Sequence, residues 1–283
     1  MCGLYLLWTD SSIFLYPFPS NSCAACTIPS LCDLSSFLMP NATSHKHSIP
    51  PLFPIHSTYT AFYCEENVYL LTKQFLENEE IRGLWDVFAV FISNSTRTVA
   101  LWKQKLQENV VIWDYHVILV IRPKPRFESD DEESDRKLKQ DILGKAWVYD
   151  FDTSLERPCT WSEYIAQTFP YSTRDTVWTI KEMYRSLFRV VPGQEYLDWF
   201  ASDRSHMVEE EDENIFTRQE PDKPIVYKSR PPPYPVIVGI RARDAGILNN
   251  LMASFVDMDA KNGGVGDVYT LEGVAGFFGE SAV

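Results

Sequence analysis

VIWDYHVILVI, residues 111–121, is almost wholly apolar, yet it carries Asp114 and His116 near its centre. This enrichment in β-branched and aromatic residues predicts a strand that is built for burial. In an unbroken strand, alternate side chains share a face, so Asp114 and His116 would point the same way. The two groups are therefore either a hydrogen-bonded pair inside the core or part of a reactive site.

The flanking segments indicate an antiparallel sheet. Residues 86–93 and 98–105 are strand-like and lie on either side of the turn sequence NSTR, which predicts a hairpin. Residues 110–123 and 145–153 are also strand-like, and the acidic segment between them predicts a solvated loop that joins two antiparallel strands. In the second of these strands, Asp150 and Asp152 share one face, with Asp152 about 7 Å further along.

A helix is predicted upstream of these strands. Apolar residues there recur at helical spacing and share one face, namely Cys64, Val68, Leu71 and Phe75. Glu65 and Glu66 fall in the first turn, where a negative charge suits the helix dipole. The segments together predict an α+β fold, in which a helix that begins near Cys64 packs on an antiparallel sheet.

If this helix packs on the face that carries His116, Cys64 would meet His116, and Asp150 or Asp152 would lie beside it. A thiol needs activation to act as a nucleophile, and a helix N-terminus and a nearby imidazolium both lower its pKa. A carboxylate can then fix the imidazole tautomer. The residues alone leave two interpretations open: a Cys-His-Asp triad, or a buried structural Cys64 with a hydrogen-bonded core His116.

Composition narrows the class of protein. The 283 residues include 26 basic and 39 acidic ones, for a net charge of −13, which argues against nucleic acid or an anionic membrane as a partner. Four of the six cysteines lie in the first 32 residues, so the remainder is not a disulfide scaffold, and we expect a reducing, intracellular setting. No apolar run is long enough to span a membrane.

Residues 1–57 are rich in Ser, Pro and Cys without periodicity, and we expect a disordered leader. The cysteines and histidines within it match no ordinary zinc spacing, so we expect no metal site. Residues 58–283 are expected to form one catalytic domain, with acidic loop insertions at about 124–144 and 208–229.

Seven blocks occur in one order along the chain: YCEENVY (63–69), FAVFISN (88–94), VIWDYHVIL (111–119), VYDFDT (148–153), FASDRSHM (200–207), PPPYP (231–235) and VYTL (268–271). Together they resemble the protein N-terminal glutamine amidohydrolase family, from about residue 59 to the end. The resemblance implies a monomer with a papain- or transglutaminase-like fold and a catalytic Cys at a helix N-terminus.

By this resemblance, Cys64 is the nucleophile, His116 the general base and acid, and Asp150 the orienting carboxylate, with Asp152 as the fallback. The candidate substrate-binding residues are those near the triad in sequence, namely Tyr63, Glu65 and Asp114. No metal or cofactor is implied. For Glu65, the alternative is a charge that only complements the helix dipole, and for Asp114 it is a brace for the strand.

The activity implied is deamidation of an N-terminal glutamine to glutamate, with release of ammonia through a thioester of the cysteine. The partners would be proteins or peptides with a free N-terminal Gln, and the product would feed the N-degron pathway in the cytoplasm and the nucleus. Two alternatives remain: a cysteine protease or transglutaminase-like acyl transferase, and a non-catalytic protein that binds N-termini.

Overall fold

The computed structural model describes residues 49–124, 146–172, 180–209 and 225–279. Its centre is a six-stranded sheet in which every neighbouring pair is antiparallel, as predicted. In spatial order, the strands are β10 (Asp267–Tyr269), β7 (Leu187–Pro192), β1 (Trp85–Ser93), β4 (His116–Pro123), β5 (Trp147–Tyr149) and β6 (Cys159–Thr160). Two small sheets pair β2 (Val99–Leu101) with β3 (Val111–Trp113), and β8 (Ala201–Ser202) with β9 (Ile237–Val238).

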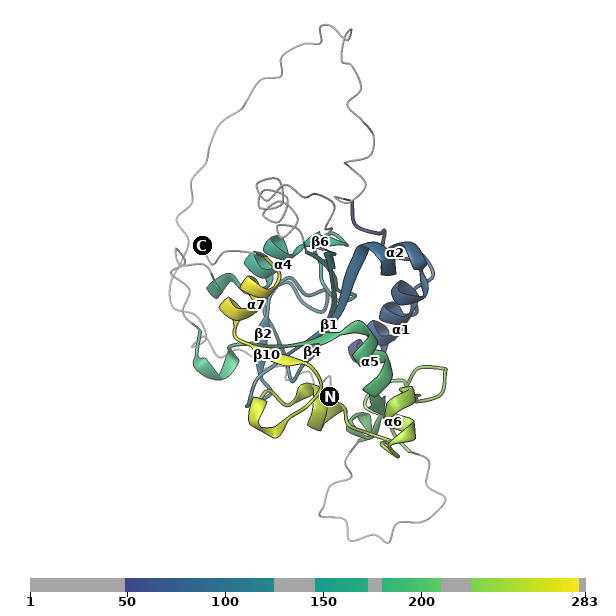
Figure 1. Ribbon diagram of the computed structural model, residues 1–283. Helices are drawn as coiled ribbons and strands as arrows, with labels where there is room; N and C mark the ends of the chain where they lie inside the picture. The colour runs from purple at the N-terminus through teal and green to yellow at the C-terminus, as the bar shows by residue number, and fades with distance from the viewer. Residues whose placement is uncertain (1–48, 125–145, 173–179, 210–224, 280–283) are drawn as a thin grey trace, which may run out of the picture.

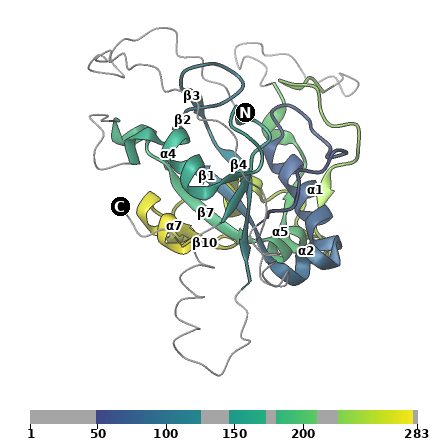
Figure 2. The same cartoon turned by 90° about the horizontal axis from the view of Figure 1, so that it is seen from above.

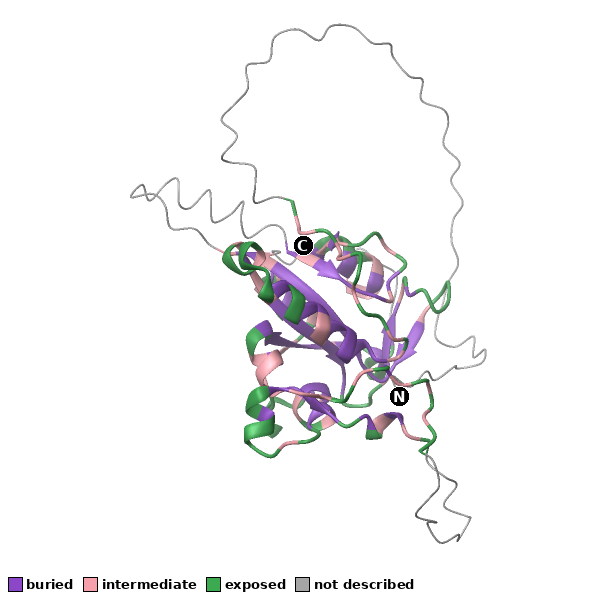
Figure 3. Ribbon diagram, turned by 90° about the vertical axis from the view of Figure 1, so that its right-hand side faces the viewer, coloured by how far each residue is buried: buried purple, intermediate pink, exposed green. Residues whose placement is uncertain are grey.

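Helices cover both faces of the large sheet, which gives the α+β architecture. One face carries α1 (Cys64–Glu77), α2 (Glu79–Leu84) and α5 (Gly193–Trp199), and the other carries α4 (Trp161–Thr168) and α7 (Leu271–Phe277) (Figures 1 and 2). The short helix α6 (Ile240–Asp244) lies beside α5. The strands between the layers are buried, while the outward sides of the helices are exposed (Figure 3).

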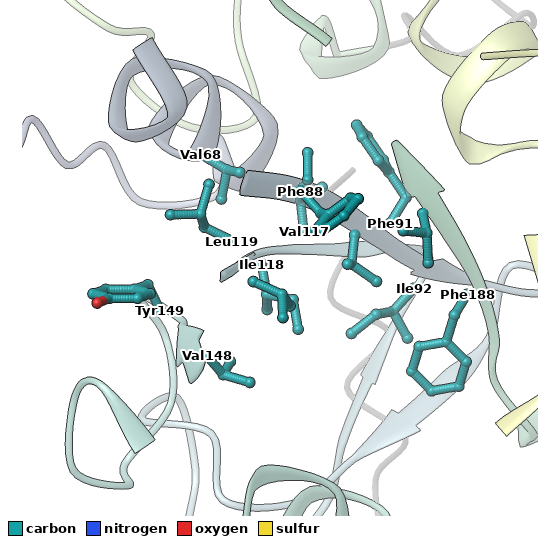
Figure 4. Packing of buried hydrophobic residues seen from close by; sticks show 14 of the residues in the cluster. Val68, Phe88, Phe91, Ile92, Val117, Ile118, Leu119, Val148, Tyr149 and Phe188 are labelled. Carbon is teal, nitrogen blue, oxygen red and sulfur yellow. The ribbon is translucent and has the colours of Figure 1, made fainter. Parts of the chain in front are cut away.

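Strand β4 is buried from both sides, which explains its continuous apolar run. Val68 of α1 and Leu119 lie on one side of the strand, and Ile118 lies on the other (Figure 4). Tyr149, which pairs with Leu119, packs edge-on against Phe75 of α1, with ring centroids 5.0 Å apart. The odd-numbered residues of β4 therefore face α1, and the even-numbered residues face α4.

The prediction of one strand over residues 110–123 is wrong, because the chain bends between β3 and β4. Asp114 Oδ1 accepts a hydrogen bond from the backbone N–H of Tyr115, and the Asp114 carbonyl accepts one from Ser93 Oγ. These bonds stabilise a non-extended backbone at Asp114. Residues 111–113 consequently pair with β2 in a separate sheet, and the alternation of faces does not carry across the bend.

The predicted hairpin of residues 86–93 and 98–105 is also wrong. Strand β1 lies at the centre of the large sheet, between β4 and β7, whereas β2 pairs with β3. The turn is present, and Asn94 Oδ1 accepts hydrogen bonds from the backbone N–H groups of Thr96 and Thr98. This local network reverses the chain and directs it into a different sheet.

Residues 49–57, which precede the predicted domain start at residue 58, contact the domain. The Pro51 carbonyl accepts a hydrogen bond from the Tyr149 hydroxyl at 2.6 Å, and the ring of Phe53 lies 5.0 Å from that of Phe151. Part of the segment assigned to the leader thus packs on the turn that follows β5.

The predictions for residues 1–48, including the cysteine- and histidine-rich region, and for most of the two acidic insertions lie outside the described residues. Where the second insertion begins and ends, Val208 and Tyr227 form an antiparallel bridge. Among the helices that the structure describes, none is both long and apolar enough to cross a membrane.

Candidate active site

His116 and Asp150 meet directly. His116 is the first residue of β4, and its Nε2 lies 2.9 Å from Oδ1 of Asp150, just after the end of β5. Both side chains are completely buried. An ionised carboxylate can only accept, so Nε2 carries the proton and Nδ1 is the basic nitrogen. Nδ1 is buried and makes no hydrogen bond with the described residues, so it is available to another group.

Asp150 accepts hydrogen bonds from three groups. Besides His116, its Oδ1 accepts from the backbone N–H of Asp152, and its Oδ2 accepts from the Tyr164 hydroxyl of α4 at 2.9 Å. Asp152 does not continue along the strand, contrary to prediction, because β5 ends at Tyr149 and the chain turns. One side-chain nitrogen or oxygen atom from each of His116, Asp150 and Asp152 lies within 4.8 Å of the other two. Of the two carboxylates, Asp150 is the one bonded to the imidazole.

Opposing effects set the charges of this pair. Burial alone would lower the pKa of His116, but the charge and hydrogen bond of Asp150 hold it above its ordinary value. Burial would raise the pKa of Asp150, but His116 and its other hydrogen-bond donors hold it below its ordinary value. Burial and the nearby Asp150 raise the pKa of Asp152. Asp150 therefore stays ionised and makes His116 a stronger base than an ordinary imidazole.

Cys64 is the first residue of α1, and its side chain is buried. Its neighbour in sequence, Glu65, accepts a hydrogen bond from the hydroxyl of Tyr115, which is the neighbour of His116, at 3.1 Å. The residues next to Cys64 and His116 are thus in direct contact. The thiol and the imidazole belong to the same region of the molecule, although 52 residues (116 − 64) separate them in sequence.

The arrangement considered above, in which α1 packs over the face carrying His116, is not the one observed, because α1 lies on the opposite face. The site forms instead around the end of the sheet. The segment before α1 reaches across that end of the sheet. The ring centroids of Phe62 and Trp113 lie 6.5 Å apart, and the Tyr59 hydroxyl donates a hydrogen bond to Asp152. Alternation along an unbroken strand would place Trp113 on the face opposite His116, but with the bend its ring stacks on the imidazole, with centroids 5.6 Å apart.

A second polar cluster adjoins Cys64. Glu65 is completely buried, and its Oε2 lies 3.7 Å from Cys64 Sγ. His206 Nε2 lies 3.4 Å from Glu65 Oε1 and 3.3 Å from the Tyr115 hydroxyl. Glu65 Oε1 makes no hydrogen bond with the described residues. Glu65 therefore does more than complement the helix dipole, since its carboxylate points into the region around the thiol.

The other two candidate substrate-binding residues have structural partners. Asp114 braces the bend through the Tyr115 N–H, which is the alternative expected for it. Tyr63 is buried, and its hydroxyl donates a 3.3 Å hydrogen bond to the Ser229 carbonyl. Neither arrangement by itself directs a polar group to Cys64.

His116, Asp150 and Asp152 could also hold a metal ion by the nature of their donor atoms. The nitrogen and oxygen atoms that would ligate the metal, however, already make hydrogen bonds: His116 with Asp150, Tyr59 with Asp152, and Tyr164 with Asp150. This pattern favours a role in proton transfer over metal binding.

The family model for N-terminal glutamine amidase matches residues 59–278, a stretch that contains every residue of this site. The chain belongs to the N-terminal glutamine amidase family. Proteins named protein N-terminal glutamine amidohydrolase include one from Danio rerio, 34% identical over 78% of this chain and 89% of its own length, and one from Homo sapiens, 32% identical over 85% and 96%. Another, from Arabidopsis thaliana, is 38% identical over 68% and 72%.

In this member of the N-terminal glutamine amidase family, three site residues escaped the sequence reasoning: Tyr59, Tyr115 and Tyr164. Tyr115 had a signal, since it lies within VIWDYHVIL, and His206 lies within another of the seven blocks, FASDRSHM. Tyr59 and Tyr164 lie in segments with no distinctive composition. Only the tertiary contacts reveal them.

The start of α1 is fixed by a buried ion pair. Arg204 donates to both carboxylate oxygens of Glu66 at 2.7 and 2.8 Å, and also to the carbonyl of Tyr234. Burial raises the pKa of Glu66, whereas the hydrogen bonds from Arg204 lower it. The Pro-rich segment 231–235 is therefore attached to the first turn of α1, which carries Cys64.

Arg204→Met is expected to lower the free energy of unfolding by about 3–5 kcal/mol, because it leaves Glu66 as an uncompensated buried charge. Chemical denaturation would measure the loss. Arg241→Met provides a matched control, since the Arg241–Asp198 pair is more exposed and should contribute less than about 1 kcal/mol. Equal losses in the two variants would contradict this view of the buried pair.

Proposed function

We propose that this protein deamidates the side chain of an N-terminal glutamine, with Cys64 as nucleophile, His116 as base and acid, and Asp150 as the orienting carboxylate. The observation that carries the proposal is the buried His116–Asp150 hydrogen bond, which leaves Nδ1 without a partner among the described residues. Membership of the amidase family supports the choice of an N-terminal glutamine as substrate.

In the proposed reaction, His116 Nδ1 takes the proton of the Cys64 thiol, and Asp150 stabilises the resulting imidazolium. The thiolate attacks the side-chain amide carbon, and the N–H groups of the first turn of α1 are candidate donors to the oxyanion. His116 then protonates the departing ammonia. It next activates a water molecule that hydrolyses the thioester, which yields glutamate and regenerates the thiol.

Glu65 is the best candidate to bind the α-ammonium of the substrate. Glu66 is paired with Arg204, Asp114 braces the bend, and Asp150 is bonded to His116. Glu65 contacts Tyr115 and His206, and these contacts hold its carboxylate beside the thiol. Glu65 places one oxygen 3.7 Å from the Cys64 sulfur and has a second oxygen without a hydrogen bond to the described residues. An ammonium bound there would position the side chain of the same residue over the thiol.

The activity is tested with a peptide that begins with Gln and with the same peptide N-acetylated. The proposal predicts ammonia release and an N-terminal glutamate from the free peptide alone. Cleavage of a peptide bond, or incorporation of an added amine, would identify a protease or an acyl transferase instead. Binding without turnover would identify a non-catalytic protein that binds N-termini.

Glu65→Gln is expected to reduce kcat/KM for a Gln peptide by about 100-fold, because a charge-assisted hydrogen bond is lost in a buried site. A sharper test compares kcat/KM for the Gln peptide with kcat/KM for an analogue that lacks the α-amino group. Wild-type protein should strongly prefer the peptide with the ammonium, and the Glu65→Gln variant should not. Asp114→Asn keeps the acceptor for Tyr115 N–H and should retain the preference. A preference that persists in Glu65→Gln would exclude this role.

Several expectations stay predictions: a monomer, work without metal or cofactor, a location in the cytoplasm and nucleus, and a product that enters the N-degron pathway. The papain- or transglutaminase-like character of the fold also remains a proposal. It is supported by a cysteine at the start of a helix and a histidine at the start of a strand.

A further inference from the structure

A pocket of about 480 Å³ adjoins the turn that carries Asp150 and Asp152, since Phe151 lines it. Four of its lining residues come from the segment upstream of the family match, and four come from the domain: Phe53, Pro54, Ile55, Ser57, Tyr59, Lys105, Phe151 and Arg157. The family model does not cover the upstream wall, so the match assigns no role to this pocket.

Tyr59 connects the pocket to the candidate active site. Its ring stacks on Phe151, with centroids 5.8 Å apart, and its hydroxyl donates a 2.6 Å hydrogen bond to Asp152. Burial, followed by the charge and hydrogen bond of Asp152, raises the pKa of Tyr59, and the charges of Cys64 and Asp150 contribute further. Tyr59 therefore lies within electrostatic range of the thiol while it also lines the pocket.

Two cations converge on the pocket. Lys105 Nζ donates to the Phe151 carbonyl at 2.7 Å, and an Arg157 N–H donates to the same oxygen at 3.5 Å. The Arg157 guanidinium also lies over the ring of Phe53, 5.0 Å from its centroid. Burial and then the positive charge of Arg157 lower the pKa of Lys105.

Neither cation forms an ion pair with a carboxylate within the described residues; their contacts there are to a carbonyl oxygen and an aromatic ring. The charges of Asp152 and Asp150 also act on Lys105 and partly offset the repulsion from Arg157, but burial and Arg157 outweigh them. Two like charges that lie close together repel each other, and a bound anion would relieve that repulsion. Of the apolar residues around the pocket, Phe151 is buried and Phe53 is half-buried, whereas Ile55 is exposed. An anion bound there would therefore be held mainly by charge-assisted hydrogen bonds to both cations.

We propose that this pocket binds the residues that follow the N-terminal glutamine and prefers an acidic side chain among them. The inference rests on the proposed function, because a glutamine held at Cys64 must direct the rest of its chain out of the site. Each extended residue spans about 3.3–3.6 Å, so a neighbouring pocket falls within reach of the next few residues. The carboxylate would lie between Lys105 and Arg157.

The test compares two peptides that begin with Gln and continue with three Glu or three Lys residues. We expect wild-type kcat/KM to be about fivefold or more higher for the acidic peptide, since each partly exposed pair contributes modestly. This ratio should shrink as salt is added, because salt screens exposed charges. In the double variant Lys105→Met, Arg157→Met, it should fall close to one.

Two control variants test whether the preference for the acidic peptide depends on the charges of Lys105 and Arg157. Lys103→Met removes the same charge from an exposed residue outside the pocket and should keep the wild-type ratio. Lys105→Arg with Arg157→Lys keeps both charges and should also keep the preference. Because the ratio is taken within each enzyme, a uniform loss of activity or of folded protein does not change it.

The outcomes separate the two proposals. No ammonia from any peptide with a free N-terminal Gln overturns the proposed function and this inference with it. Ammonia release at equal rates from acidic and basic peptides overturns the pocket proposal alone. A preference that survives in the double Met variant assigns the selectivity to another surface and likewise overturns it.

Discussion

Cys64→Ala is expected to lower ammonia release from a peptide with a free N-terminal Gln by about 10⁴-fold or more. In the proposed reaction, the sulfur forms the thioester, so its removal eliminates the chemical step and leaves only what binding contributes. The measurement is steady-state release of ammonia under saturating substrate. Affinity for the peptide should change far less than turnover, because the groups proposed to bind the substrate remain in place.

Cys159→Ala is the matched control for this substitution. Cys159 is also buried, but burial, followed by the charge of Glu163, raises the pKa of its thiol to about 12, so it is not a nucleophile at neutral pH. We expect this variant to remain active within a few-fold of wild type. Full activity in Cys64→Ala, or a matching loss in Cys159→Ala, would overturn the assignment of the nucleophile.

Asp150→Asn is expected to reduce kcat by about 10³- to 10⁴-fold while the protein stays folded. An amide in place of the carboxylate can present its NH₂ to Nε2, which would move the ring proton to Nδ1, the nitrogen that must accept the thiol proton. It also removes the charge that stabilises the imidazolium. Asp152→Asn, which leaves the His116–Asp150 bond intact, should stay within about tenfold of wild type. Similar losses in both variants would exclude Asp150 as the specific partner.

The stability of the Asp150→Asn variant as a function of pH gives an independent test of the coupling between His116 and Asp150. The pKa of His116 is raised above 6.5, so its contribution is present below that pH and is lost as pH rises through the raised pKa. The pKa of Asp150 is lowered below 3.8, so its contribution is present above that pH and is lost as pH falls through the lowered pKa. The pair stabilises most between pH 3.8 and 6.5.

Between about pH 6 and pH 9, the free energy of unfolding of wild type should therefore fall through this pair as His116 loses its proton. In Asp150→Asn, His116 is buried without a charged partner, so the same rise in pH should leave stability unchanged or increase it. Denaturant titrations at the two pH values measure both slopes. A parallel decline in the two proteins would contradict the coupling of His116 to Asp150.

Local pattern predicted the elements of this protein more reliably than their arrangement. The helical spacing from Cys64 to Phe75 corresponds to α1, and the strand-like runs around His116 and Trp147 correspond to β4 and β5, which pair antiparallel as expected. Such predictions succeed because periodic burial reflects the dihedral angles of a single element. They required nothing from distant parts of the chain.

The same reasoning failed wherever two elements had to be placed relative to each other. Alternation along residues 111–121 holds only while the backbone stays extended, and the hydrogen bonds of Asp114 end it there. Nothing in the spacing of α1 states which sheet face it covers, because β4 is buried on both faces. The position of Asp150 relative to His116 depended on where β5 ends, and no feature of the sequence marks that end.

The sequence by itself therefore determined the secondary-structure elements, the family, and the three residues proposed for catalysis. Only the tertiary structure decided that the site is built around the end of the sheet, with Tyr59, Tyr164 and His206 brought in from distant segments. The physical reason is that residue patterns encode short-range backbone geometry, whereas contacts between distant segments depend on the packing of the whole chain. That packing gives VIWDYHVILVI its bend and places His116 beside Asp150.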